Sequence, residues 1–135
     1  HDIVYNARMS DNEHQSALLF KKRISNTSFP YIKECMKQIE ATKAHEPSEN
    51  QDTNILLDLD LSTLGLNRKD YQQYCAAIRK EYKIYPDFMY RKGRKKVLQH
   101  FLDSKSIYKT NFFHEKYERQ ARENLMSELN FANLR

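Results

Sequence analysis

The chain has 135 residues, of which 39% are hydrophobic and 30% are charged, and it carries a net charge of +5 from 23 basic and 18 acidic residues. This length fits one domain with a real hydrophobic core. No apolar run approaches the roughly 20 residues that a membrane-spanning helix needs, and the first ten residues lack the apolar segment of a signal peptide. We therefore expect a soluble cytoplasmic protein with no membrane partner. A mildly positive charge does not by itself require nucleic acid as a partner.

The composition favours helix, because the chain has only two glycines and no tryptophan and is rich in residues with high helix propensity. No alternating strand pattern and no internal repeat is visible. The two cysteines, Cys35 and Cys75, have no CxxC spacing and lie on apolar stripes, which indicates free thiols rather than a metal site or a disulfide. We expect an all-α fold of about six helices in a single domain that covers residues 1–135.

The first predicted helix covers residues 10–23. It opens with a capping-box pattern, in which Ser10 is the N-cap and Glu13 follows three residues later. The second helix covers residues 28–45, begins around a proline and ends near Pro47. Its apolar positions have the i, i+3, i+4, i+7 spacing of one helix face. They are Ile32, Cys35, Met36 and Ile39.

The third predicted helix follows a polar loop at residues 48–52, covers residues 55–64 and ends at Gly65 as a C-cap. Asn67 caps a fourth helix, whose apolar face is Tyr71, Tyr74, Cys75, Ile78 and Tyr82. A fifth helix begins at residues 85–87 and carries Val97, Leu98, Phe101 and Leu102. The last helix covers residues 111–130, with Phe113, Tyr117, Ala121, Leu125 and Leu129 spaced by four.

Two acidic segments carry the chemistry that the sequence suggests. One is the pair His1 and Asp2, and the other holds Asp58 and Asp60 among leucines. An ionised carboxylate is costly to bury unless it is paired or binds a cation, and imidazole with carboxylate oxygens suits Mn, Fe, Co, Ni or Zn. Because neighbours on a helix point about 100° apart, His1 and Asp2 could reach one ion only at a helix end or in a bend. The alternative, equally open, is that both aspartates face solvent and His1 is a frayed terminus.

The chain resembles the HD-domain superfamily of metal-dependent phosphohydrolases, and more narrowly a group of small bacterial proteins predicted to be such enzymes. The resemblance covers nearly the whole chain, as an ordered series of segments that begins with His1 and Asp2. The further segments are residues 11–13, 16–17, 41–45, 57–61, 64–65, 78–82, 93–94, 97–98 and 121–125. The resemblance implies an HD-type helical bundle that hydrolyses a phosphate ester by metal-activated water, with nucleotides among the candidate substrates.

By position in the sequence, His1 and Asp2 match the adjacent histidine and aspartate that are metal ligands in the HD-domain superfamily. Asp60 is the better match to the final aspartate, and Asp58 is the second choice. His45 resembles the extra histidine of some HD proteins. The first histidine of the family lies upstream of the doublet, so we expect that N-terminal helices precede this chain and that its ligand set is incomplete.

Glu13 resembles the acid that orients water or acts as a general acid or base in some HD enzymes, and its alternative role is that of the capping-box acid. The other three histidines, His14, His100 and His114, lie in charged surroundings and are predicted to be surface residues.

The densest basic run covers residues 91–96. Arginine suits bidentate phosphate contacts, so Arg94 and Arg91 are candidates to hold the phosphoester substrate, and a solvated helix face is the alternative. The alternative function is a non-catalytic helical module that binds nucleic acid or a phosphorylated partner through this basic helix. No aromatic residues that could stack on bases interleave around Lys95. We therefore expect no appreciable nucleic-acid binding at physiological salt.

Overall fold

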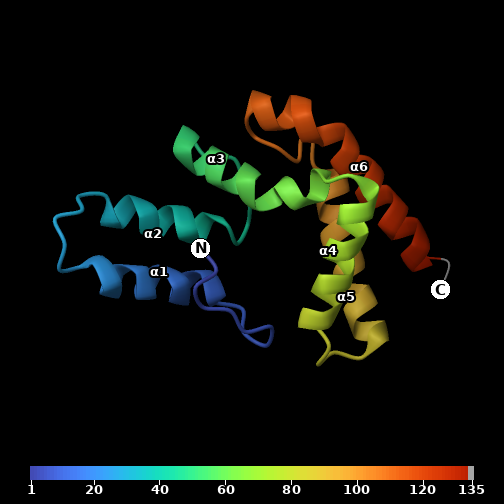
Figure 1. Cartoon of the computed structure of the whole chain (residues 1–135), viewed down its shortest axis with the longest axis horizontal. Coiled ribbons are helices and arrows are strands. Elements are labelled where there is room, and N and C mark those ends of the chain that lie inside the picture. Colours follow the sequence, from blue (N-terminus) through green and yellow to red (C-terminus); the bar gives the residue numbers. More distant parts are fainter. Residues whose placement is uncertain (134–135) are drawn as a thin grey trace. The chain divides into compact units, whose positions relative to one another are not determined.

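The computed structural model describes residues 1–133, and within that range it consists of six α-helices, one short 3-10 helix and connecting turns (Figure 1). The all-α architecture of about six helices is thus confirmed. The residues group into two compact units, His1–Leu57 and a second that begins at Asp58. The prediction of a single domain stays a prediction, and each unit is described by itself.

The first unit is built on a helical hairpin. Helices α1 (Asn12–Ile24) and α2 (Ile32–Ala41) pack against each other (Figure 1). Ala17 and Ile39 are buried on the two helices. His14 Nδ1 of α1 lies 2.7 Å from Glu40 Oε1 of α2. Next to the helices, the Lys43 ammonium, after α2, donates to the Ser10 carbonyl, before α1, over 2.6 Å. The boundary between the units falls within helix α3 (Gln51–Asp60).

The second unit contains the 3-10 helix η1 (Leu61–Gly65), α4 (Arg68–Glu81), α5 (Asp87–Asp103) and α6 (Asn111–Asn133). The long helix α6 packs against both η1 and α5, and α4 also contacts η1. Their shared core consists of Leu61, Leu64, Tyr71, Leu98, Ile107, Tyr108, Phe113, Ala121 and Leu125. The four-residue spacing on α6 therefore marks its buried face, as predicted.

Gly65 allows η1 to lie close to α6. A Cβ atom added to this glycine would lie 2.6 Å from Tyr117 Cβ, closer than two carbon atoms tolerate. Two turns further along α6, the Asn124 side-chain amide donates to the carbonyls of Leu64 and Leu66, over 2.9 and 2.8 Å. The predicted helix over residues 55–64 is in fact two elements, since α3 ends at Asp60 and the 3-10 helix η1 follows it up to Gly65. Gly65 is not the predicted C-cap, because Leu66 occupies that position and the glycine does not adopt the left-handed conformation of a glycine C-cap.

Several predicted details are wrong. The helix α2 ends at Ala41 rather than at residue 45, and α3 begins at Gln51, within the predicted polar loop. Val97 is 45% exposed although the pattern placed it on a buried face. Asn67 caps α4 as predicted, since its side chain accepts from the Asp70 amide over 3.1 Å.

Cys35 and Cys75 are free thiols, as expected. Among residues 1–133, none of the helices combines the length and the apolar character that crossing a membrane requires.

Candidate metal centre

His1 and Asp2 lie outside any helix, directly before a bend at residues 3–4. The imidazole Nε2 of His1 and the carboxylate Oδ2 of Asp2 are 3.0 Å apart. First-row ions bind such atoms at about 2.1 Å, so two neighbouring ligands at right angles around one ion lie roughly 3.0 Å apart. The pair therefore has the spacing of two ligands of a single ion. The same spacing is a hydrogen-bond distance, which keeps the two groups together without an ion.

Helix α1 holds this segment in place through two side chains. The buried Ser16 hydroxyl accepts from the Val4 amide over 3.0 Å and donates to the Val4 carbonyl over 3.2 Å. One turn earlier, the Asn12 side chain accepts from the Asn6 amide and donates to the Asn6 carbonyl. Each of the two side chains binds both the amide and the carbonyl of one residue, so together they fix the path of the segment that follows Asp2.

Glu13 lies on α1 between these two anchoring residues, and it is half-buried. The predicted capping box is wrong: Asp11 occupies the N-cap position, and no side chain caps the helix there. The structural alternative for Glu13 thereby loses its basis. Its role as a general acid or base stays a prediction.

The two aspartates of α3 have different environments. The Asp58 side chain is completely buried, and its carboxylate accepts from the Lys109 and Thr110 amides and from the Thr110 hydroxyl over 2.7–2.8 Å. It thus fixes the turn from which α6 starts. The interpretation of Asp58 as a solvent-facing acid is wrong. Asp60, the last residue of α3, is half-buried.

His45 follows the turn after α2 and is half-buried. Its φ of 53° lies in the left-handed region, which non-glycine residues seldom adopt. Its amide donates to the carbonyl of Ala41, the last residue of α2, over 3.1 Å. The histidines predicted to lie on the surface, His14, His100 and His114, are all exposed.

Arg94 of α5 forms a bidentate pair with Glu128 of α6, with Nε–Oε1 and Nη2–Oε2 distances of 2.7 and 2.9 Å. The Tyr71 hydroxyl and the Cys75 thiol also donate to Glu128 Oε2. Any phosphate contact from Arg94 would have to compete with this carboxylate. Arg91 is exposed on the same helix. The substrate-binding roles of both arginines stay predictions.

Burial would raise the pKa of the Glu128 carboxyl, but the hydrogen bonds and charge of Arg94 outweigh it and lower that pKa overall. Burial likewise would lower the pKa of Arg94, and pairing with Glu128 raises it instead. For Cys75, burial and the nearby Glu128 charge act together and raise the thiol pKa to about 11. The four side chains form one polar cluster in which Glu128 and Arg94 are charged and the other two groups are neutral.

The sequence-predicted site residues are divided between the units. His1, Asp2, Glu13 and His45 belong to the first unit, where His1 and Asp2 lie together. Asp60, Arg91 and Arg94 belong to the second. The Arg94–Glu128 cluster was missed, because its members come from three helices and no spacing in the sequence connects them.

Comparison of the chain with protein-family models, with curated proteins and with solved structures found no match.

Proposed function

We propose that the protein is a metal-dependent phosphohydrolase of the HD type, in which His1, Asp2 and Asp60 bind a divalent metal ion. One observation carries the proposal: the imidazole and the carboxylate of the adjacent His1 and Asp2 lie 3.0 Å apart, with the spacing of two ligands of one ion. The ordered resemblance of the sequence to HD domains supports it. His45 is retained as a candidate further ligand.

The donor chemistry fits such an ion. One imidazole with two carboxylates suits Mn, Fe, Co, Ni or Zn. Asp60 is the preferred third ligand, because the Asp58 carboxylate already accepts three hydrogen bonds from residues 109 and 110. A divalent ion bound there would activate water and offset the negative charge of a phosphate ester.

The residues of the chain would then position and protonate the reactants. Glu13 is carried by α1, the helix that holds the segment following Asp2. A carboxyl at that place can accept a proton from attacking water and return it to the leaving oxygen. Arg91, which is exposed, suits a contact with the phosphate group.

The test is a screen of phosphate esters, including nucleotides, with the purified protein in Mn²⁺ and again in excess chelator. We expect turnover that requires the metal and that falls at least a hundredfold in Asp60→Asn and in His1→Ala. The exposed His100 provides the matched control, since His100→Ala should keep wild-type turnover. Turnover that persists in chelator, or an Asp60→Asn protein as active as wild type, would refute the proposal.

A further inference from the structure

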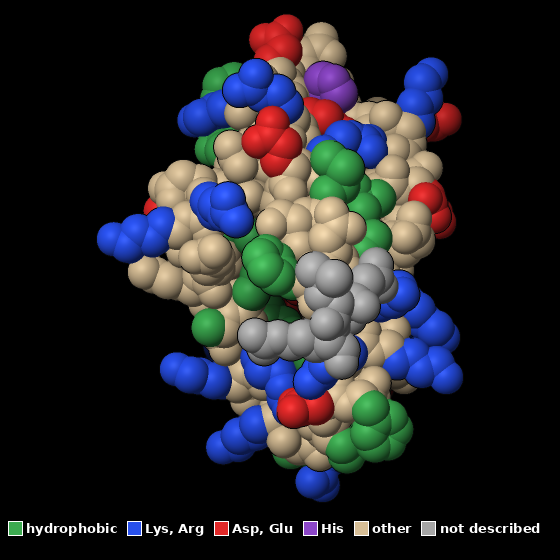
Figure 2. Space-filling model, turned by 90° about the vertical axis from the view of Figure 1, so that its right-hand side faces the viewer, with side chains coloured by type: hydrophobic (Ala, Val, Ile, Leu, Met, Phe, Trp, Pro, Cys, Tyr) green, Lys and Arg blue, Asp and Glu red, His purple; other side chains and the backbone are tan. Residues whose placement is uncertain are grey.

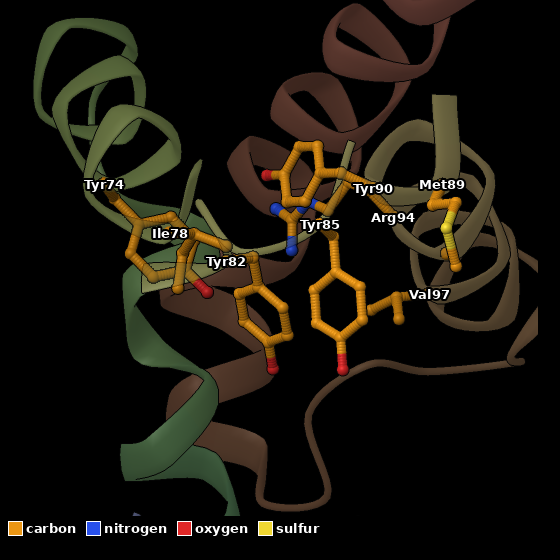
Figure 3. A pocket seen from close by; sticks show the side chains of 9 residues that line it. Tyr74, Ile78, Tyr82, Tyr85, Met89, Tyr90, Arg94 and Val97 are labelled. Carbon is orange, nitrogen blue, oxygen red and sulfur yellow. The ribbon is translucent and has the colours of Figure 1, made fainter. Parts of the chain in front are cut away.

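A pocket of about 490 Å³ lies in the second unit (Figure 3). Its described lining residues all come from α4, from α5 and from the connection between these two helices. We call it the tyrosine pocket, because four of these residues are Tyr74, Tyr82, Tyr85 and Tyr90. Its volume is that of small-molecule sites in general, which span about 300–1,000 Å³.

One arginine fixes the part of the wall that carries two of the tyrosines. Arg79 donates from Nη1 to the Tyr82 carbonyl over 3.0 Å and from Nη2 to the Tyr85 carbonyl over 3.3 Å. The same Nη2 pairs with Asp87 Oδ1 over 2.5 Å, and the guanidinium lies 4.8 Å from the Tyr90 ring centroid. A wall that is fixed before a ligand arrives costs less conformational entropy when the ligand binds.

The rings present aromatic surface to whatever enters the pocket. Tyr82 and Tyr85 stack with their centroids 6.2 Å apart and their planes at 29°, and Figure 3 shows their hydroxyl groups pointing the same way. The Tyr90 ring lies 6.3 Å from that of Tyr82. Two further lining residues, Met89 and Val97, are 48% and 45% exposed, so apolar surface is left open to solvent here. An aromatic ligand would cover this surface and also gain ring contacts that a saturated molecule does not make.

Gly93 keeps one side of the pocket open. It lies inside α5, where glycine is unfavourable compared with alanine. No close packing explains it, because a Cβ added there would meet nothing within 4 Å. Gly93 is itself a lining residue of the pocket. A glycine that weakens its helix without making a close contact is accounted for if the space beside it must remain free for a ligand.

The pocket offers no uncompensated charge to a ligand. Among the described residues that line it, Arg94 is the only charged one, and its guanidinium is held by Glu128 over 2.7 and 2.9 Å. Arg79 is paired with Asp87. The other charged side chains of α5 do not line the pocket, and Figure 2 shows Lys and Arg side chains projecting outward on the face that it displays. A charged ligand would therefore lose its hydration without gaining a counter-charge, which is costly.

We propose that the tyrosine pocket binds an uncharged, planar aromatic molecule, whose rings contact the tyrosine side chains and occupy the space beside Gly93. The fixed aromatic wall, the open space and the absence of a free charge all point to this class of ligand. The pocket uses none of the proposed metal ligands. Binding is therefore expected whether or not the protein holds a metal ion.

Calorimetric titration at neutral pH, without added metal, tests the ligand class with four molecules of similar size. They are neutral 2-naphthol, its saturated analogue decahydro-2-naphthol, the anion 2-naphthoate and the cation 2-naphthylmethylammonium. We expect 2-naphthol to bind about tenfold more tightly than the saturated analogue, because only the aromatic molecule makes ring contacts. Both charged molecules should bind at least about tenfold more weakly than 2-naphthol, because they lose hydration without a counter-charge.

Two substitutions localise the binding. Gly93→Leu fills the space beside α5 without a clash, and Tyr82→Leu removes one ring. Each should weaken 2-naphthol binding about tenfold, by loss of volume and of ring contacts respectively. Gln99→Leu, on the exposed surface of α5, is the matched control and should leave the affinity unchanged. Thermal melts establish that each variant is folded.

Three results would overturn the proposal. The first is that 2-naphthol does not bind, or binds no more tightly than the charged molecules. The second is a folded Gly93→Leu protein that binds 2-naphthol like wild type. The third is a wild-type chain that sedimentation shows to be a dimer and that Gly93→Leu converts to a monomer, since a second copy would then occupy the pocket.

Discussion

At the scale of single residues, the polar cluster around Glu128 shows how much one carboxylate can hold together. It accepts from Arg94, Tyr71 and Cys75, which come from α5 and α4. Its side chain is only 18% exposed, so solvent screens these contacts weakly. Removing one member of a buried ion pair is strongly destabilising, because the other member then keeps its charge without a partner.

Glu128→Gln should lower the free energy of unfolding by about 3 kcal/mol, because Arg94 keeps its buried charge without a counter-charge. Urea denaturation measures this. Glu123 lies on the same helix in an exposed 3.8 Å pair with Arg119, so Glu123→Gln should change stability by less than about 0.5 kcal/mol. Equal effects of the two substitutions would show that the buried cluster does not stabilise the fold.

The same carboxylate gives the fold a pH dependence of known sign. The pKa of Glu128 is lower in the folded protein than its ordinary value. The stabilisation of the fold by the Glu128 carboxylate is therefore complete above the ordinary glutamate pKa of about 4.3. It is lost as the pH falls through the pKa that Glu128 has in the folded protein. Denaturation midpoints measured from pH 6 to pH 2 should fall more steeply for wild type than for Glu128→Gln. Parallel curves would contradict this assignment.

Cys75 should be an unreactive thiol at neutral pH, because its pKa is raised to about 11 and the thiolate is the reactive form. In a Cys35→Ser background, the rate of iodoacetamide alkylation should keep rising up to about pH 11. Adding Glu128→Gln should shift this profile to lower pH, since the Glu128 charge contributes to the raised pKa. A profile centred near the ordinary thiol value of about 8.5 would be inconsistent with the cluster.

At the scale of helices, the two glycines have opposite roles. Gly65 lies against Tyr117 where a Cβ has no room, whereas Gly93 has open space beside it. We expect Gly65→Ala to destabilise the protein by about 1–3 kcal/mol through overpacking. Gly93→Ala should stabilise it by about 0.5–1 kcal/mol through helix propensity. Thermal or urea unfolding of the two variants compares them directly, and a Gly65→Ala protein as stable as wild type would mean that η1 and α6 are not in close contact.

Local patterns in the sequence predicted the helices well. Contacts between residues that are far apart in the sequence could not be predicted from it. The Asn67 cap needs only the following turn, and it formed as expected. Ser10 failed as a cap because Asn12 and Ser16 instead bind the preceding segment, so that α1 starts at Asn12. The Asp58 carboxylate accepts from amides of residues more than 50 positions away in the sequence. The spacing of apolar residues along a helix gives no information about such a contact.

At the scale of the whole molecule, the net positive charge and the proposed metal ligands come from different segments of the chain. The net charge of the chain comes from the segment that contains α4 and α5, beside the tyrosine pocket. The metal ligands proposed from the sequence come instead from the start of the first unit and from the end of α3. The sequence indicated both groups of residues. It could not show that the tyrosines of α4 and α5 line one pocket, since the stripe on α4 reads equally well as core.

The central claim is that His1, Asp2 and Asp60 bind a divalent metal ion while Asp58 fixes the turn before α6. Calorimetric titration of Mn²⁺ or Ni²⁺ into wild type, Asp60→Asn and Asp58→Asn tests it most directly, with urea unfolding of each variant measured alongside. We expect one ion bound per wild-type chain, an affinity at least tenfold weaker in Asp60→Asn, and an affinity within about threefold of wild type in a less stable Asp58→Asn protein. Absence of binding in wild type, or loss of binding in a folded Asp58→Asn protein with retention in Asp60→Asn, would contradict the claim.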